Sequence, residues 1–417
     1  MYENKYKNKY RIRNKSYCVF LWMLLMTNFT IWNASASPNE QAGVESVSAG
    51  VGYTCATLKN GSAWCWGRDN KHQLRSDSAA NKDNNLPSRV SGEGLWETVD
   101  SSFRSSCGIK VDGTWWCWGA VTRKLSPGVR KQSFLALIKQ LQDEVYRDWY
   151  KVATSDLHAC AIKRDGTLWC FGANESHQIG KPDQLYMHIE DKVLPVGRLM
   201  PFITAFVPNP LQVGKRAEWK SVAVGNDHTC AIDKTDRLWC WGGNDQGQLG
   251  LPSNAKYGAP TLVDKKATWQ QVTIGAKFTC AIKSDKSLWC WGNNEGGQLG
   301  GGIEEKVSHK PVRVKLDKQW LFVDAKLGAT CAIAQDHSLW CWGTHLLFPT
   351  ADNSNRVNAP IQTAMKHQWN KVAVGGEHLC AVKTDGTLWC WGFGGLGLGR
   401  DVDRTLQPLQ VLFPNVD

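Results

Sequence analysis

Cysteine is the residue type in this sequence whose spacing could carry chemistry. The chain of 417 residues has 15 Cys, and fourteen of them form seven pairs whose members lie ten positions apart. Zinc and redox sites usually place two cysteines two to four residues apart, and the chain has no C-x-x-C. We therefore expect seven disulfides. The pairs are Cys55 and Cys65, Cys107 and Cys117, Cys160 and Cys170, Cys230 and Cys240, Cys280 and Cys290, Cys331 and Cys341, and Cys380 and Cys390.

The second cysteine of each pair lies in a Trp-Cys-Trp-Gly motif, in which Phe171 replaces the second Trp of the third copy. Between the two cysteines, two β-rich runs flank a short turn that often reads Asp-Gly, which is typical of a hairpin. In the third copy, a turn at 164–166 would set Cys160 opposite Cys170. This register puts the cysteines at a non-hydrogen-bonded pair, with Cα atoms about 4.5 Å apart. That separation suits a disulfide.

Each predicted hairpin must be covered on both of its faces. In the third copy, Trp169 and Phe171 project to one face of the strand, and Leu168 and Cys170 project to the other. Seven repeats of roughly 50 residues bury both faces when they stack around an axis. We therefore predict an all-β fold, a seven-bladed β-propeller with short antiparallel blades, over residues 37–417. An open solenoid is the alternative, but its ends would expose Trp-rich faces without polar caps.

Residues 1–36 have the composition of a signal peptide. A basic stretch ends at Lys15, an apolar run begins at Cys18, and Ala34-Ser35-Ala36 supplies small residues for a signal peptidase. An uncleaved N-terminal anchor is the alternative. Removal of six Lys/Arg and one Glu with this segment lowers the formal net charge from +11 to +6. We expect an exported protein that is periplasmic, cell-surface or secreted, without membrane contact after cleavage, because disulfides persist in those compartments.

The repeat resembles that of the regulator of chromosome condensation family. The family motifs G-x-x-H-[ST]-x-A-[IL] and W-G-x-N-x-x-G-Q-L-G are matched most fully at Gly225–Ile232 with Trp241–Gly250, and at Gly275–Ile282 with Trp291–Gly300. The resemblance covers nearly all of residues 44–415 and implies a seven-bladed propeller. Because every hairpin carries a cysteine pair, the chain departs from the nuclear members of the family and resembles an exported bacterial branch.

Two segments interrupt the repeat. Residues 120–148 carry apolar residues at helical spacing, which predicts one helical insertion. The helix either packs on the propeller or binds a partner. Residues 181–210 form a second insertion, rich in apolar residues and proline. This insertion is either a recognition loop or a structural loop that folds back on the propeller.

The positions that differ among the repeats are the candidates for function. Two positions shortly before the first cysteine of each pair change from copy to copy, while the motif around them recurs. They precede a strand in every blade, so all copies should gather on one rim of the propeller. The histidines there can also be read as hydrogen-bonded packing residues. The candidate partner-binding rim comprises Tyr53, Arg104, His158, Asp227, His228, Lys277, Phe278, Glu377 and His378.

Familiar catalytic motifs do not occur in the sequence. There is no G-x-S-x-G, H-E-x-x-H or P-loop, and the neighbours Asp227 and His228 lack an accompanying nucleophile. A residue that recurs in every blade is a scaffold residue first. We therefore predict a monomeric, non-enzymatic scaffold that binds a protein partner through the rim, with no cofactor, no metal and no nucleic acid.

Two other functions stay open. The family resemblance implies guanine-nucleotide exchange on a small GTPase, because Asp227, His228 and His378 match rim positions that contribute in the nuclear member. Exchange would require delivery to a cytosol, where seven disulfides are unstable. A cell-wall glycan hydrolase or lyase would require two carboxylates that face one cleft, and the sequence identifies no such pair.

Overall fold

The computed structural model describes residues 43–75, 83–119, 147–181, 188–189, 192–193, 206–215, 218–252, 256–344, 356–399 and 402–414. Every regular element in these ranges is a β-strand. None of these residues belongs to a helix long and apolar enough to cross a bilayer. The expected helix lies outside the described residues apart from its last two positions, and the expected signal peptide lies outside them entirely.

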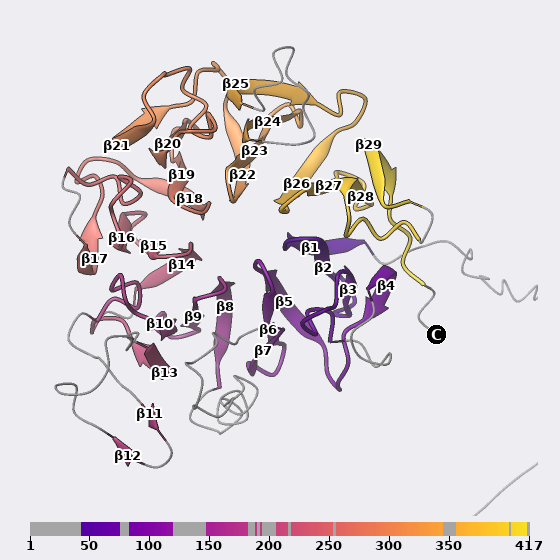
Figure 1. The fold of residues 1–417 in the computed structure, drawn as a ribbon, viewed down its shortest axis with the longest axis horizontal. Coiled ribbons are helices and arrows are strands. Elements are labelled where there is room, and N and C mark those ends of the chain that lie inside the picture. The colour runs from indigo at the N-terminus through magenta and orange to yellow at the C-terminus, as the bar shows by residue number, and fades with distance from the viewer. Residues whose placement is uncertain are drawn as a thin grey trace, which may run out of the picture. The chain divides into compact units, whose positions relative to one another are not determined.

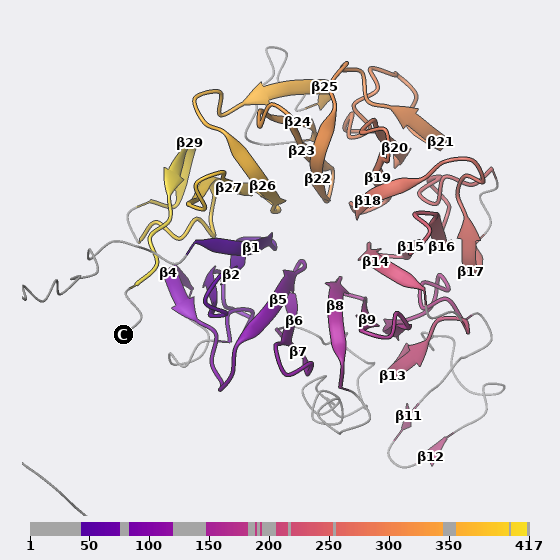
Figure 2. The same ribbon diagram turned by 180° about the vertical axis from the view of Figure 1, so that it is seen from behind.

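Seven antiparallel sheets surround a central axis, so the fold is a seven-bladed β-propeller, as predicted (Figures 1 and 2). We number the blades 1 to 7 in chain order, and the first strand of each blade lies nearest the axis. The described part of blade 2 has three strands, and the other blades have four. Blade 1 contains β1 (Val44–Ala49), β2 (Tyr53–Leu58), β3 (Ala63–Gly67) and β4 (Asn84–Arg89); blade 2 contains β5 (Trp96–Ser101), β6 (Ser105–Lys110) and β7 (Trp115–Gly119); blade 3 contains β8 (Trp149–Thr154), β9 (His158–Lys163), β10 (Leu168–Ala173) and β13 (Phe206–Gln212).

The later blades repeat this order of strands. Blade 4 contains β14 (Trp219–Val224), β15 (His228–Asp233), β16 (Leu238–Gly242) and β17 (Tyr257–Leu262); blade 5 contains β18 (Trp269–Ile274), β19 (Phe278–Lys283), β20 (Leu288–Asn293) and β21 (Val307–Arg313); blade 6 contains β22 (Trp320–Lys326), β23 (Ala329–Ala334), β24 (Leu339–Thr344) and β25 (Arg356–Thr363); blade 7 contains β26 (Trp369–Val374), β27 (His378–Lys383), β28 (Leu388–Phe393) and β29 (Arg404–Gln410).

The central hairpin of each blade has the register that the cysteine spacing predicts. In blade 3, Cys160 pairs with Cys170 and Ile162 pairs with Leu168, and the Lys163 N–H donates to the Thr167 carbonyl across the turn. All seven predicted disulfides are formed, with Cα atoms 4.0 to 4.1 Å apart. The disulfide prediction is therefore confirmed in every blade.

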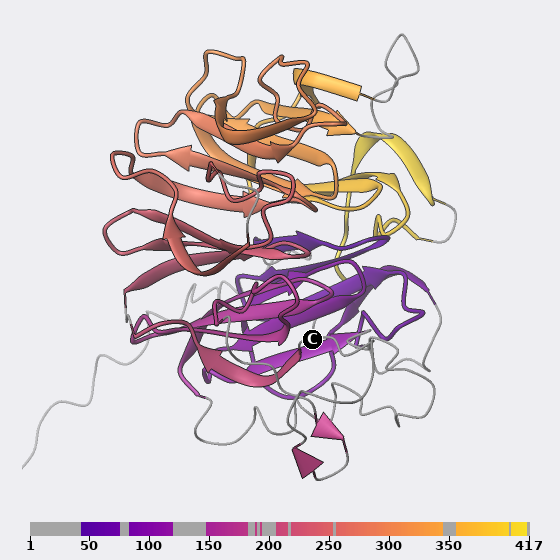
Figure 3. The ribbon, with the colours of Figure 1, turned by 60° about the vertical axis from the view of Figure 1, so that its left-hand side comes forward.

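Part of the second expected insertion is a blade strand. Residues 206–212 form β13, the outer strand of blade 3, which pairs Cys170 with Leu211 and Gly172 with Val207 across a bulge. Pro210 lies within the bulge, where its missing N–H breaks no ladder hydrogen bond. The short strands β11 (His188–Ile189) and β12 (Lys192–Val193) pair with each other beyond β13, at the periphery of blade 3 (Figures 1 and 3).

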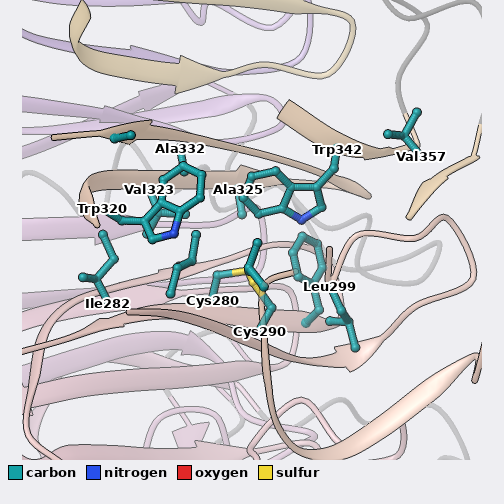
Figure 4. Close-up of a cluster of buried hydrophobic side chains, with 14 residues drawn as sticks. Cys280, Ile282, Cys290, Leu299, Trp320, Val323, Ala325, Ala332, Trp342 and Val357 are labelled. Carbon is teal, nitrogen blue, oxygen red and sulfur yellow. A yellow bond between two sulfur atoms is a disulfide. The ribbon is translucent and has the colours of Figure 1, made fainter. Parts of the chain in front are cut away.

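Neighbouring blades pack through tryptophans and disulfides. Between blades 5 and 6, Trp320 and Trp342 lie beside the Cys280–Cys290 disulfide and Leu299 (Figure 4). Both indoles are buried, and their ring centroids are 6.2 Å apart. Burial of an aromatic side chain removes about 150–250 Å² from water, which at about 25 cal/mol per Å² contributes roughly 4–6 kcal/mol before entropy is counted.

Blades 1 and 7 close the ring without sharing a strand, because each blade is built from one continuous part of the chain. The Val44 N–H donates to the Gly386 carbonyl, and the Gly376 N–H donates to the Gly50 carbonyl, both at 3.0 Å. Trp66 of blade 1 and Cys380 of blade 7 share one buried cluster. Packing and loop hydrogen bonds therefore complete the propeller.

Candidate functional site

The loops between the first and second strands of each blade emerge on one face of the propeller, together with the loops that follow the third strands. This follows from the antiparallel order, since the first and third strands of a blade run in the same direction. We call the first set the loop rim. It comprises residues 51–52, 103–104, 156–157, 226–227, 276–277, 327–328 and 376–377.

The recurring glycine of Trp-Cys-Trp-Gly supports each rim loop. In all seven blades this glycine has a φ between +97° and +117°. A Cβ at Gly242 would lie 2.5 Å from the Asp227 carbonyl oxygen, and one at Gly292 would lie 2.6 Å from the Lys277 carbonyl oxygen. The residue after Gly242 donates its N–H to that same Asp227 carbonyl at 2.8 Å. The motif therefore holds the rim backbone in one position and leaves the rim side chains free to vary.

Burial divides the nine predicted rim residues into two groups. Arg104 and Glu377 are exposed, and Asp227 and Lys277 are half-buried. The other five open the second strand of their blades and pack against neighbouring blades instead of facing solvent. These five residues, each no more than 3% exposed, are Tyr53, His158, His228, Phe278 and His378.

The buried histidines link successive blades. The His158 Nε2 lies 2.8 Å from the Thr229 Oγ1 of blade 4, and that hydroxyl donates to the Gln178 carbonyl. Because the threonine proton is used on the carbonyl, His158 must donate through Nε2. Burial lowers the pKa of His158 to about 3, so the ring is neutral and structural. His378 makes the equivalent contact to Thr54, at 2.7 Å, across the ring closure.

The Asp227 carboxylate contacts its neighbour His228 and two further side chains. The His228 Nδ1 lies 3.2 Å from the Asp227 Oδ1, the Gln248 amide donates to both carboxylate oxygens, and the Lys277 Nζ lies 3.5 Å away. Burial would raise the pKa of Asp227, but the hydrogen bond from His228 and the charges of His228 and Lys277 outweigh it and lower the pKa to about 2. Lys277 also pairs with Asp245 at 2.7 Å.

Lys326, which is not among the predicted rim residues, reaches across the axis of the propeller. The Nζ of Lys326, in blade 6, donates to the Ser101 carbonyl of blade 2 at 2.6 Å. Asp100 accepts the Thr154 N–H of the next blade at 2.7 Å, and Asp324 accepts the Val374 N–H at 2.8 Å. Burial raises the pKa of both carboxyls, although the Lys326 charge opposes the rise.

The composition of blade 6 explains why a lysine fits at position 326. Four other blades have glycine at the equivalent position, where a Cβ at Gly275 would lie 1.9 Å from the Phe278 ring and one at Gly50 would lie 2.1 Å from the Tyr53 ring. Blade 6 has the small residue Ala329 instead of an aromatic or histidine. Lys326, which stands where four other blades have glycine, is therefore the feature of the sequence that indicates a side chain at the axis.

A pocket of about 240 Å³ lies where the rims of blades 1 and 2 meet. Two of its cations, Arg68 and Lys71, belong to the loop after β3, and Arg104 belongs to the rim of blade 2. All three are exposed, and none forms an ion pair with a described residue. The lining residues are Val51, Arg68, Asn70, Lys71, Gln73, Phe103 and Arg104.

The loop after the third strand changes charge around the ring, and sequence reasoning overlooked this signal. Blades 3, 4 and 5 have an exposed acid three residues after the glycine that ends the recurring tryptophan–cysteine motif. These acids are Glu175, Asp245 and Glu295. Blade 1 has Asn70 at the equivalent position and is basic at Arg68 and Lys71. The described residues contain no cluster of three or more His, Cys, Asp or Glu side chains arranged to hold a metal ion.

Two models of the regulator of chromosome condensation (RCC1) repeat match this sequence, and together they cover more than half of it. The chain belongs to the RCC1 repeat family. One model matches residues 44–73, 149–178, 219–248, 269–298 and 369–397, and the other matches residues 165–232, 235–282 and 285–335.

Curated relatives share the repeat over part of their length. The ultraviolet-B receptor UVR8 of Arabidopsis thaliana is 27% identical over 213 residues, which are 49% of this chain and 42% of the receptor. The human E3 ubiquitin-protein ligase HERC2 is 24% identical over 225 residues, which are 51% of this chain and 4% of the ligase. The match thus spans less than half of either relative.

Solved RCC1-type structures share the fold. Prp20p of Saccharomyces cerevisiae superposes with a TM-score of 0.64 at 19% identity, over 84% of this chain and 85% of that one. Human WBSCR16 superposes with a TM-score of 0.54 at 17% identity, over 91% and 84% of the two chains. At these identities the likeness establishes the propeller and carries no residue roles.

Proposed function

We propose that this chain is an exported, non-enzymatic scaffold that binds a protein partner through its loop rim. One observation carries the proposal: every blade repeats the disulfide hairpin and its supporting glycine, whereas the exposed rim residues above them differ. Loops presented on a rigid scaffold commonly carry recognition. Arg104, Leu157, Lys277 and Glu377, which each directly precede the second strand of their blades, differ in charge, size and polarity on equivalent backbone positions.

The structural relatives support protein binding as the kind of function. Prp20p has described binding properties to Gsp1p and histones. Yeast RCC1 has been solved bound to Kap60, and that chain superposes on this one with a TM-score of 0.51 at 18% identity. Those partners belong to the yeast protein. For this chain, they support a protein as the ligand class without identifying the partner.

The seven disulfides support export, since such bonds persist in oxidising compartments outside the cytoplasm. We expect the purified protein, unfolded without reductant, to be lighter than the reduced protein by two hydrogens for each of the seven disulfides. Intact-mass spectrometry measures this difference. Recovery of mostly free thiols from the native source would contradict export.

Capture of a partner tests the rim directly. The immobilised protein would be compared with a Lys277→Ala, Glu377→Ala rim variant and with a Lys234→Ala, Glu93→Ala control, which removes the same two charges from the opposite face. We expect the rim variant to retain at least about fivefold less partner, because a few residues carry most of an interface's binding energy. Equal capture by all three proteins would refute the rim assignment.

The two alternative functions have less support from the geometry. In the exchange-factor reading, Asp227 and His228 would act on a GTPase, yet His228 is fully buried and Asp227 is engaged by three neighbours. Release of labelled GDP from a panel of small GTPases would test this reading. In the hydrolase reading, two carboxylates would face one cleft, whereas no Asp or Glu lines the pocket between blades 1 and 2.

A further inference from the structure

The pocket between blades 1 and 2 concentrates positive charge on one part of the propeller face that carries the loop rim. Arg68 and Lys71 approach it from the loop after β3, and Arg104 approaches it from blade 2. Like charges in one concave site repel one another and attract anions from solution. Elsewhere on the rim, the cation Lys277 is neutralised by Asp227 and Asp245. The three pocket cations have no such partner among the described residues.

The carboxylates near this pocket accept hydrogen bonds, mostly from backbone N–H groups. Asp69 accepts the Leu74 N–H at 3.0 Å, and Asp83 accepts the Asp69 N–H at 3.0 Å. At the inner edge, Asp156 accepts the Arg104 N–H at 2.9 Å and the Ser102 hydroxyl at 2.9 Å. These carboxylates fix loops and offset part of the local charge. They leave the Arg68 guanidinium and the Lys71 ammonium facing solvent, while the exposed Arg104 guanidinium lies over the Phe103 ring, 4.9 Å from its centroid.

The basic loop is held in place before any ligand arrives. The Arg68 N–H donates to the Gly52 carbonyl at 2.8 Å, and the Lys71 N–H donates to the Gln73 side chain at 2.7 Å. The Trp118 indole of blade 2 donates to the Gln73 carbonyl at 2.6 Å. A preformed site pays less ordering entropy on binding. The pocket is therefore a built feature of the blade 1–2 junction.

From this geometry we infer that the pocket binds a carboxylate-bearing segment of the protein partner, an inference that rests on the proposed function. Arg68 and Arg104 can each hold a carboxylate through two N–H groups. Val51 and Phe103 line the same pocket, and they can pack against the methylenes of a glutamate side chain, whereas a free inorganic anion gains nothing from apolar walls.

The loops after the third strands of other blades argue against a nucleic acid as the occupant. Glu175, Asp245 and Glu295 are exposed on the equivalent loops of blades 3, 4 and 5. A phosphate backbone that followed the ring would meet Glu175 and Glu295 after leaving the pocket, as well as Asp245, whose charge Lys277 offsets. A short acidic peptide segment occupies the basic part alone and avoids this repulsion.

Fluorescence anisotropy with a labelled, capped tetraglutamate peptide tests the inference, with tetraglutamine as the uncharged control and inorganic phosphate as competitor. We expect the purified protein to bind tetraglutamate at low salt and not tetraglutamine. An Arg68→Gln, Lys71→Gln, Arg104→Gln variant should bind at least about tenfold more weakly. A Lys234→Gln, Lys265→Gln, Lys266→Gln variant removes three exposed cations elsewhere and should bind within about twofold of the wild type.

Equal tetraglutamate binding by both triple variants would overturn the inference, as would binding too weak to detect. Displacement of the peptide by phosphate at an equal concentration would also overturn it, in favour of a free-anion site. This experiment is independent of partner capture, whose rim variant leaves the three cations intact. If wild-type protein captures a partner but does not bind tetraglutamate, the pocket assignment fails and the proposed function stands. If wild-type protein binds tetraglutamate but captures no partner, the proposed function fails, and the pocket stands only as a site for acidic peptides.

Discussion

The rim of blades 4 and 5 and the rim of blades 1 and 2 share one backbone design and differ in charge. In blades 4 and 5, Asp227, Asp245 and Lys277 satisfy one another in a network that also includes His228. In blades 1 and 2, Arg68 and the other pocket cations face solvent. A repeated scaffold can therefore neutralise its surface charges in one region and leave them without an ion pair in another, while its strands stay the same.

The largest expected effect concerns what the two regions share. The Trp118 indole donates to the Gln73 carbonyl under the basic pocket, and the Trp291 indole donates to the Gln248 carbonyl under the acidic network. Both side chains are buried. We expect Trp118→Ala and Trp291→Ala each to lower the free energy of unfolding by about 3–5 kcal/mol. Denaturant titration with the disulfides intact measures this loss. A loss below about 1 kcal/mol at either site would show that the two tryptophans do not stabilise their blades equally.

The next effect is specific to blades 4 and 5. The pKa of Asp227 is about 2 in the folded protein, below its ordinary value of 3.8. Because the folded pKa is the lower one, this carboxylate stabilises the protein above pH 4, and its contribution is lost as the pH falls from about 4 to 2. We expect Asp227→Asn to lower the free energy of unfolding at pH 7 by about 2 kcal/mol.

Stability measured against pH distinguishes this effect from a general loss of packing. The difference between wild type and Asp227→Asn should shrink as the pH approaches 2. Glu377→Gln serves as the control, since Glu377 is an exposed rim carboxylate; it should change stability little at any pH. A pH-independent deficit in Asp227→Asn would mean that the amide disturbs the loop geometry and that the ion pairs contribute little.

The smallest expected effects have opposite signs in the two regions. Lys277→Gln removes partly exposed ion pairs and should lower the free energy of unfolding by about 0.2–1 kcal/mol. The Arg68→Gln, Lys71→Gln, Arg104→Gln variant removes repulsion and should leave stability unchanged or raise it by up to about 0.5 kcal/mol. Thermal unfolding of the two variants, each compared with the wild type, measures the sign of each change in stability. Clear destabilisation of the triple variant would show that the pocket cations have structural partners.

The sequence predicted the repeated parts of the molecule because their signals are local. A turn between Cys160 and Cys170 determines their register, and the alternation of side chains along a strand determines which faces are apolar. The same reasoning located the rim, since each loop directly precedes a strand. It did not separate buried from exposed rim residues, because burial of His158 or Phe278 depends on the neighbouring blade and not on its own hairpin.

By itself, then, the sequence determined seven disulfide hairpins, the propeller and the face on which the variable loops gather. Tertiary structure alone decided which of those loop residues reach solvent, that Lys326 spans the axis to Ser101, and that Arg68, Lys71 and Arg104 line one pocket. The physical reason is distance along the chain. Hairpin pairing joins residues about ten positions apart, whereas the axis contact and the pocket join side chains of different blades, whose relative positions arise only when the ring is closed.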